Sequence, residues 1–284
     1  MPLIRPRLRD EALLADIEAA RAEDRFYVWW LGQSGFLVQW RGHRLLFDPY
    51  LSDSLTRKYA DTDKPHVRMT EPAVAPEKLA GIELATSTHN HTDHLDAETL
   101  LPLMRANPAM RLVAPEANRA FAAERLGCDP AWLLGADAGG RAEAGAFVLH
   151  GVPAAHEGLD LDEKGRHPYL GYVARFGPWT VYHSGDTVLY EGMEEALAPF
   201  DIDLALLPIN GRKPERRVSG NLWGREAAGL AKRIGAKAVI PCHYEMFEFN
   251  TEPPDAFVAA CEKLEQPYAV LRCGERWDSP PAPS

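Results

Sequence analysis

The chain has 284 residues, a formal net charge of -10 at pH 7, 46% hydrophobic residues and 25% charged residues. This length and composition suit one large α/β domain with a substantial core and exclude a chain that is disordered throughout. The acidic balance argues against a general nucleic-acid or membrane-surface binder, so we expect neither partner.

The cysteines and the N-terminal segment bear on location. There are four cysteines and no C-x-x-C pair, which gives neither a disulfide framework nor a cysteine zinc cluster and suits a reducing compartment. The first residues, MPLIRPRLRDEALL, lack the apolar core of a signal peptide. No stretch approaches the roughly 20 apolar residues that span a bilayer. We therefore expect a cytoplasmic protein.

The N-terminal part of the chain begins with an expected helix and continues with clustered strands. Residues 9–24 have helical spacing, and we interpret 1–24 as a helical extension that packs or makes a subunit contact, so a homo-oligomer is one expectation. Short turn-like connections predict an antiparallel meander of three strands, at 26–31, 35–40 and 43–48. Segment 51–80 is polar with several prolines and is interpreted as a long loop or lid.

From Ile82 onward, strands and helices alternate, which predicts packed sheets flanked by helices. Strands are expected at 82–88, 110–115, 146–152, 170–176, 179–186, 202–209, 236–241 and 268–273. Helices are expected at 96–106, 116–127 (ending at Gly127), 191–198, 225–235 and 254–264. Without a convincing linker, we expect a single domain over 25–277 and a disordered tail over 278–284.

The segment STHNHTDHLD carries three histidines and an aspartate in the pattern H-x-H-x-D-H, directly after an apolar run. In an extended segment His89, His91 and Asp93 would share a face, with His94 beside them. Imidazole and carboxylate ligands suit zinc, iron or manganese. A histidine-rich surface loop is the alternative, but this full spacing after a strand is far more specific. Asp96 is the expected N-cap of the following helix, with Glu98 in its first turn.

Four residues cannot complete two metal shells, so further ligands are expected at later strand ends. His156 follows the strand FVLHGV, Asp186 follows WTVYHS, and His243 follows AVIP. A shared sheet edge could bring all three to the histidine motif.

Together these residues resemble the ligand pattern of the metallo-β-lactamase superfamily, from about Phe26 to near the end of the chain. Within it, VWWLGQSGF, THNHTDHLD, VYHSGDT and AKAVIPCHYEMFEFNTEPP resemble the L-ascorbate 6-phosphate lactonase group. HNHTDHLD and the PAAH around His156 are also similar to N-acylphosphatidylethanolamine phospholipase D.

The resemblance implies an α/β fold, an αββα sandwich of two mixed sheets flanked by helices, with the site at one sheet edge. It implies one metal on His89, His91 and His156, a second on Asp93, His94 and His243, and Asp186 as the bridge. It also implies manganese or zinc as the ion; iron remains open, and some members work with one ion.

These ligands and this resemblance predict a metal-dependent hydrolase, in which a metal-bound hydroxide is the nucleophile. Asp93 or Asp186 would carry the proton to the leaving oxygen, and the sequence does not choose between them. The first hypothesis is the opening of a phosphorylated sugar lactone or a related small ester. A phosphodiesterase acting on a cyclic phosphate or a phospholipid-like substrate is the alternative. A non-catalytic metal-binding protein is a third, which the complete ligand set disfavours.

Lesser candidates lie close to these residues in sequence. Asp48 and His183 could orient ligands, with a turn aspartate and a strand-end histidine as the ordinary interpretations. Asn210, Gly211 and Arg212 follow a strand and could line the pocket, as could Tyr244, for which packing is the more ordinary role. Two basic loops suggest a small anionic substrate, although both could simply be solvated: Arg57, Lys58, Lys64 and Arg68 in one, and Arg212, Lys213, Arg216 and Arg217 in the other.

Overall fold

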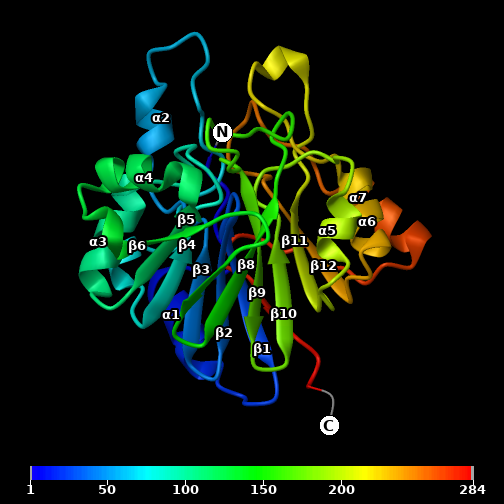
Figure 1. Ribbon diagram of the computed structural model, residues 1–284, viewed down its shortest axis with the longest axis horizontal. Helices are drawn as coiled ribbons and strands as arrows, with labels where there is room; N and C mark the ends of the chain where they lie inside the picture. The colour runs from blue at the N-terminus through cyan, green and yellow to red at the C-terminus, as the bar shows by residue number, and fades with distance from the viewer. Residues whose placement is uncertain (1, 283–284) are drawn as a thin grey trace.

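The computed structural model describes residues 2–282. Two mixed β-sheets pack face to face, and helices cover the outer face of each (Figure 1). The predicted αββα sandwich is confirmed. No helix among the described residues is long and apolar enough to cross a membrane.

The first sheet has seven strands in the order β13-β1-β2-β3-β4-β5-β6. Their bounds are β1 (Phe26–Gly32), β2 (Gly35–Trp40), β3 (His43–Phe47), β4 (Ile82–Thr86), β5 (Arg111–Pro115), β6 (Leu133–Ala136) and β13 (Arg276–Asp278). The meander predicted for β1, β2 and β3 is confirmed, since both pairs are antiparallel. From β3 to β6 the pairing is parallel.

The second sheet has six strands in the order β12-β11-β10-β9-β8-β7. Their bounds are β7 (Arg141–Ala144), β8 (Phe147–Pro153), β9 (Leu170–Phe176), β10 (Trp179–His183), β11 (Leu204–Pro208) and β12 (Ala238–Cys242). Strands β10, β11 and β12 are parallel, and β9 is antiparallel to both β8 and β10. The strands β8, β10 and β12 therefore end at the same edge of this sheet.

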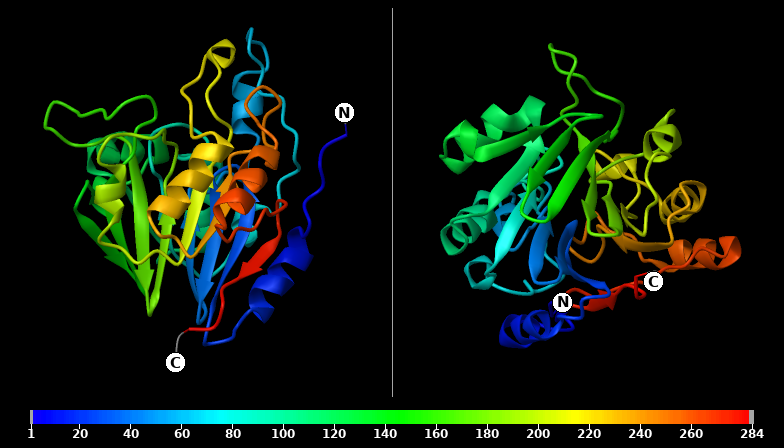
Figure 2. Two further views of the ribbon diagram at one scale, coloured as in Figure 1. Left: turned by 90° about the vertical axis from the view of Figure 1, so that its right-hand side faces the viewer. Right: turned by 60° about the horizontal axis from the view of Figure 1, so that its bottom comes forward.

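Helices α1, α3 and α4 lie on the side of the first sheet, and α5, α6 and α7 on the side of the second (Figures 1 and 2). The α-helices are α1 (Asp10–Ala19), α2 (Ser54–Lys58), α3 (Ala97–Ala106), α4 (Arg119–Leu126), α5 (Met193–Leu197), α6 (Gly224–Arg233) and α7 (Asp255–Leu264). Short 3-10 helices cover Pro76–Lys78, Glu116–Asn118, Pro130–Trp132 and Pro214–Arg216.

Strand β1 shows why the first sheet is buried on both faces. All seven of its residues are buried. Because side chains alternate along a strand, Phe26, Val28 and Trp30 join the core between the sheets, whereas Tyr27 and Trp29 join the core beneath the helices. Helix α1 contributes Leu13 and Ile17 to that second core, so the N-terminal extension packs on the sheet.

Two predicted helix boundaries are confirmed by their capping geometry. The Asp96 side chain accepts a hydrogen bond from the Glu98 N–H at the start of α3. Gly127 ends α4 in the left-handed conformation, with φ of 60°.

Other sequence expectations need correction. The strand expected over 268–273 is reduced to a single bridge between Tyr268 and Val239, after which the segment has no ladder partner among the described residues. The prediction that residues 278–284 are disordered is wrong for the first two of them. Asp278 belongs to β13, and Ser279 is buried and hydrogen-bonded to Phe26. Residues 283 and 284 lie outside the described residues.

Candidate metal centre

The histidine motif lies in a loop, residues 87–95, that follows β4 at the upper edge of the sandwich in Figure 1. This segment is not extended as the alternation argument assumed. The N–H groups of His94 and Leu95 both donate to the carbonyl of His91, over 3.1 and 2.9 Å, so the backbone turns on itself. Turns, and not strand alternation, therefore bring the histidines together. We call residues 87–95 the histidine loop.

The three remaining candidates come from other strand ends and meet the histidine loop. His156 follows β8, Asp186 follows β10 and His243 follows β12. The seven side chains form three overlapping groups whose ligand atoms lie within 4.8 Å of one another: His89, His91 and His156; His89, His94 and Asp186; and Asp93, His94 and His243. The first and third groups have the same members as the two sites that the resemblance implies, and Asp186 lies between them.

The spacing of these atoms fits coordination to a cation. His156 Nε2 lies 3.2 Å from His91 Nδ1, and Asp186 lies 3.3 Å from His94 Nε2 and 3.2 Å from His243 Nε2. Two ligand nitrogens at about 2.05 Å from one tetrahedral ion would lie about 3.3 Å apart.

Hydrogen-bond satisfaction gives the same indication. The Nε2 atoms of His89 and His94 are buried and have no hydrogen-bond partner among the described residues. Buried polar atoms are seldom left unpaired without a reason. The donor set, imidazoles with carboxylates and no thiolate, suits zinc, manganese or iron.

Neighbouring groups fix which nitrogen of two histidines faces the cluster. The Nδ1–H of His94 donates to Oδ2 of Asp48 over 2.7 Å, and the Nδ1–H of His156 donates to the carbonyl of Gly220 over 3.1 Å. In both cases Nε2 is left with a lone pair directed at the centre. Asp48, a candidate from the sequence, is therefore placed where it orients His94.

Burial and charge set the protonation of the cluster. Burial lowers the pKa of His89 well below its usual 6.5 and lowers the pKa of His156 to about 4, so both are neutral near pH 7. Burial also opposes charge on His94, but nearby carboxylates, Asp186 first, raise its pKa well above 6.5. Burial likewise opposes charge on Asp186, yet His243 and His94 hold its pKa well below the usual range. The carboxylates around His94 therefore favour positive charge at its Nε2, and a bound cation would supply that charge in place of the proton.

Close approaches hold the loops in register. Gly185, next to Asp186, has φ of 60°, and a Cβ there would lie 2.7 Å from the side chain of Thr88. Only glycine fits this contact without displacing the histidine loop. His243 has φ of 63°, a conformation that non-glycine residues seldom adopt, and its N–H donates to the carbonyl of Gln33.

Two residues that the sequence did not single out also support the centre. Gln33, in the turn between β1 and β2, donates from Nε2 to Oδ2 of Asp93 over 2.8 Å and lies 3.0 Å from His243 Nε2. Arg125, on α4, donates from Nη1 to the carbonyls of Asn90 and Leu95 in the histidine loop. Gln33 belongs to VWWLGQSGF, but neither that motif nor the sequence around Arg125 assigns them a role, and only their contacts reveal it.

The lesser candidates are placed in different ways. His183 donates from Nε2 to the carbonyl of Ser34 over 2.9 Å and stacks on Phe47, so it supports the turn that carries Gln33. Tyr244 is buried against Trp30 with its hydroxyl on a backbone carbonyl, which is a packing role.

Asn210, Gly211 and Arg212 do not line the main pocket. The Asn210 amide is buried and bonded to Asn250, and Gly211 lies close against Trp223. Arg212 forms a bidentate ion pair with Glu226 and lines a smaller neighbouring cavity.

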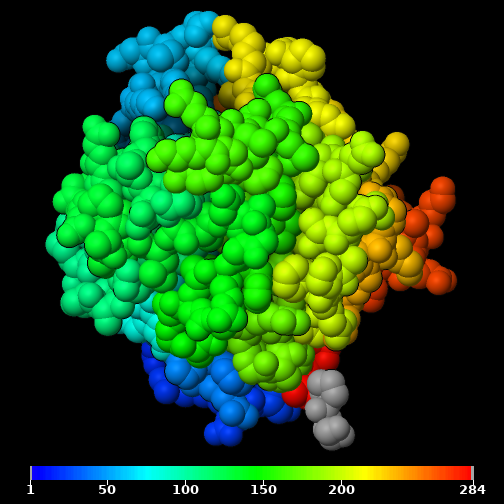
Figure 3. Space-filling view, viewed as in Figure 1, coloured from blue at the N-terminus to red at the C-terminus, as the bar shows by residue number. Residues whose placement is uncertain are grey.

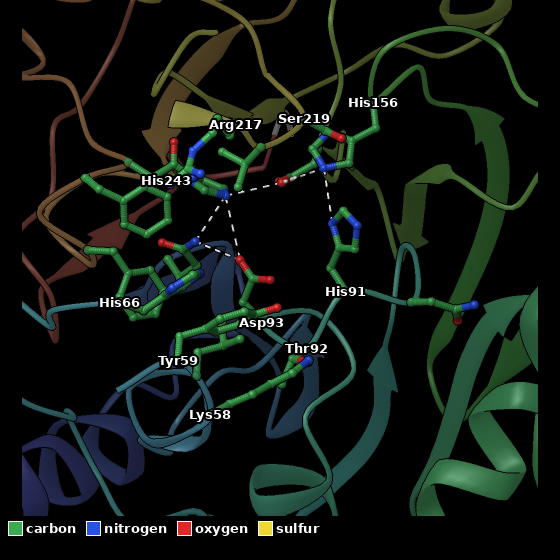
Figure 4. Close-up of a pocket in the computed structure, with 18 of the residues that line it drawn as sticks. Lys58, Tyr59, His66, His91, Thr92, Asp93, His156, Arg217, Ser219 and His243 are labelled. Carbon is green, nitrogen blue, oxygen red and sulfur yellow. Dashed lines mark hydrogen bonds and ion pairs between the residues drawn. The ribbon is translucent and has the colours of Figure 1, made fainter. Parts of the chain in front are cut away.

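A pocket of about 620 Å³ opens above the centre. Figure 4 shows His91 and His156 on one side of it and Asp93 and His243 on the other. The expected 51–80 loop contributes part of the wall through α2 and the residues after it, including Lys58, Tyr59 and His66.

Most cations of the two basic loops are neutralised by the protein itself. Arg57 pairs with Glu98, Arg68 with Asp53, Arg212 with Glu226, Lys213 and Arg216 with Glu252, and Arg217 with Asp63. Within residues 2–282, Lys58 and Lys64 form no ion pair; each lies over an aromatic ring instead. Of the charges in the two basic loops, only these two lysines therefore still support the prediction of an anionic substrate.

The fold and the clustered ligands define a metal-dependent hydrolase of the metallo-β-lactamase superfamily. The beta-lactamase superfamily domain matches residues 43–244. The chain is 30% identical over 261 residues to a UPF0173 metal-dependent hydrolase of Myxococcus xanthus, covering 89% of this chain and 82% of the relative. A second UPF0173 metal-dependent hydrolase, from Pyrobaculum aerophilum, is 29% identical over 84% of this chain and 92% of its own length. The chain belongs to the UPF0173 metal-dependent hydrolase family of this superfamily.

Solved structures share the fold. Igni18, a metallo hydrolase of Ignicoccus hospitalis, superposes with a TM-score of 0.65 at 22% identity, covering 90% of this chain and 99% of that one. The isothiocyanate hydrolase from Delia radicum gut bacteria superposes with a TM-score of 0.68 at 16% identity, covering 88% of this chain and 98% of that one.

Proposed function

We propose that the protein hydrolyses a small anionic ester, with a phosphorylated sugar lactone or a related ester as the first substrate class. The observation that carries this proposal is the convergence of seven histidine and aspartate side chains, of which five line a pocket of about 620 Å³: His91, Asp93, His156, Asp186 and His243. The alternative within the same chemistry is a phosphodiesterase acting on a cyclic or phospholipid-like phosphate.

The chain would hold two divalent cations, manganese or zinc, with iron as the other candidate. His89, His91 and His156 would hold one, Asp93, His94 and His243 the other, and Asp186 would reach both. Such ions supply a water of lowered pKa and a Lewis acid for the oxygen under attack.

The two aspartates differ in a way that separates their roles. The Asp186 side chain is 4% exposed and lies within 3.7 Å of His94, His156 and His243. Both aspartates line the pocket, but the Asp93 side chain is 15% exposed and accepts a hydrogen bond from Gln33 on Oδ2. We therefore assign the proton transfer to the leaving oxygen to Asp93 and a purely holding role to Asp186.

The test compares two substrates on manganese-loaded protein: a phosphorylated sugar lactone and bis(4-nitrophenyl) phosphate. Asp186→Ala should abolish turnover. Asp203→Ala, which removes a buried carboxylate remote from the centre and bonded to Thr180 and Lys237, should not. Lactone opening that disappears only in Asp186→Ala supports the proposal. Diester cleavage without lactone opening selects the alternative. Bound metal with no turnover of either substrate overturns both.

A further inference from the structure

One wall of the pocket is built from aromatic rings. His66 stacks on Tyr59 with ring centroids 4.1 Å apart, and it meets the rings of Phe249 at 4.5 Å and Phe247 at 5.3 Å. All four residues line the pocket. We call Tyr59, His66, Phe247 and Phe249 the aromatic wall. Burial lowers the pKa of His66 below 6.5, so near pH 7 its ring is mostly neutral.

The aromatic wall lies next to one half of the metal centre. In Figure 4, Tyr59 and His66 are near Asp93 and His243, whereas His91 and His156 are farther away. None of the reactions considered above needs aromatic rings at this place, because the ligand set performs the chemistry. An apolar surface beside the centre instead fits a part of the substrate that does not react.

The ammonium groups of two lysines lie over rings of the aromatic wall. The Lys58 ammonium lies 5.1 Å from the centroid of the Tyr59 ring, and the Lys64 ammonium lies 5.1 Å from the Phe249 ring. Neither forms an ion pair within the described part of the chain. Lys58 lines the pocket and Lys64 does not, so an anion bound at the wall would meet Lys58 as a cation that no protein carboxylate pairs with among the described residues.

The opposite side of the pocket opening is formed by the loop that contains Pro214 and Val218. Arg217 of this loop pairs with Asp63 over 2.7 Å, which joins the two sides above the centre. In Figure 3 the segments that carry these residues meet at the top of the molecule. The pocket therefore has aromatic rings on one side and a loop on the other whose lining residues are Pro214, Arg217, Val218 and Ser219.

We propose that the substrate carries a flat, conjugated ring with a negatively charged substituent. The ring lies on the aromatic wall, the charged substituent lies beside Lys58, and the scissile group reaches the half of the centre formed by Asp93 and His243. This inference rests on the proposed function and adds to it a requirement for a flat ring.

Binding of non-hydrolysable probes to manganese-loaded protein tests the proposal by calorimetry. Three probes differ by one feature each: methylphosphonate, phenylphosphonate and 4-phosphonobenzoate. We expect phenylphosphonate to bind about ten-fold more tightly than methylphosphonate, because the ring gains aromatic contacts. We expect 4-phosphonobenzoate to bind several-fold more tightly again at low salt, and to lose this gain at high salt.

Substitutions in the pocket test which residues produce each gain in binding affinity. Phe249→Leu keeps apolar volume but removes the ring, and it should reduce the phenyl-to-methyl preference about three- to ten-fold. Tyr59→Leu should act in the same direction. Lys58→Gln should remove only the gain from the carboxylate, and Lys64→Gln, outside the pocket lining, should have the smaller effect. Phe200→Leu and Lys263→Gln, which do not line the pocket, are the matched controls. Because each variant is compared with itself across probes, small losses of stability cancel.

Two failures are distinguishable. Equal binding of methylphosphonate and phenylphosphonate, or an unchanged preference in both Phe249→Leu and Tyr59→Leu, would overturn the ring requirement and leave the hydrolase proposal intact. Failure of all three phosphonates to bind to protein that holds manganese would overturn the proposal of an anionic substrate in this pocket, and the ring inference with it.

Discussion

Asp48 and His94 form a buried pair behind the metal centre: the Nδ1–H of His94 donates to Oδ2 of Asp48 over 2.7 Å, and neither side chain is exposed. Burial alone would raise the pKa of Asp48, but the hydrogen bond from His94 and the nearby His183 hold it below the usual range. Thr86 and Thr88 also donate hydroxyl hydrogen bonds to this carboxylate. The pair therefore fixes the ring of His94 with Nε2 directed at the centre.

Asp48→Asn should weaken metal binding, because the amide keeps the shape of the side chain but loses the charge that orients His94 and makes it a better ligand. We expect affinity for manganese to fall about 10- to 100-fold, with the fold retained. Calorimetric titration of apo protein measures the effect, and Asp203→Asn is the control for a buried carboxylate elsewhere. Unchanged affinity in Asp48→Asn would contradict the orienting role.

Metal removal should destabilise the native protein. A bound ligand stabilises the folded state by about 2.7 kcal/mol when its concentration is 100 times its dissociation constant. For a chain of this size, we expect a chelator to lower Tm by roughly 5–10 °C. Differential scanning calorimetry with and without the chelator measures this change. His243→Ala should show a smaller response, and equal responses in both proteins would mean that the chelator acts elsewhere.

The candidate ligands and the orienting role of Asp48 were predictable from sequence, whereas the supporting contacts of Gln33 and Arg125 were not. His156, Asp186 and His243 each follow an apolar strand-like run, and strand ends that share an edge gather their residues. Gln33 lies in an ordinary turn and Arg125 on an ordinary helix, so only the folded chain shows their contacts. The prediction that the histidine motif is extended was wrong. Hydrogen bonds within turns determine the path of the backbone there, and the residue pattern does not reveal them.

The same limit applies to strands at the margins. β13 has only three residues, and its pairing with β1 joins positions about 250 residues apart. No local sequence pattern therefore predicts this strand. The segment 268–273 has a strand-like composition but lacks a partner for a full ladder. Strand formation depends on the neighbour as well as on the segment itself.

The Asp162–Arg166 turn gives a pH prediction away from the centre. The side-chain hydrogen bond from Arg166, aided by backbone N–H groups, lowers the pKa of Asp162 from 3.8 to about 2. The stabilisation of this turn is therefore fully present above the usual pKa and is lost as the pH falls through about 2. At pH 3 the carboxylate should be about 90% ionised, against roughly 15% for an unperturbed aspartate.

Carboxyl carbon shifts in selectively labelled protein report this ionisation at pH 3. Arg166→Gln should move the midpoint upward but not to the unperturbed value, because the N–H groups of residues 164 and 166 still donate to Asp162. Arg141→Gln, which removes an exposed charge paired with Glu143, is the control. A midpoint near 3.8 in the unmodified protein would contradict the role of Arg166.

Arg125 gives the sharpest test of how the histidine loop is held. Its Nη1 donates to the carbonyl of Asn90 over 2.7 Å and to the carbonyl of Leu95 over 3.2 Å, so one group joins the two ends of the segment that carries His91, Asp93 and His94. Arg125→Lys keeps the charge, but the lysine side chain is one bond shorter than arginine to its terminal nitrogen, so the ammonium does not reach both carbonyls. We expect manganese affinity to fall about ten-fold and amide hydrogens of residues 90–95 to exchange faster.

A purely structural arginine would change the free energy of unfolding without changing metal affinity relative to a stability-matched variant. Arg105→Lys, at an exposed position on α3, is the control for the substitution itself. If Arg125→Lys binds manganese as the unmodified protein does and the loop amides exchange at the same rate, then Arg125 does not position the ligands. Slower metal dissociation in the variant would contradict the proposal as well, because a looser loop must release its ion more easily.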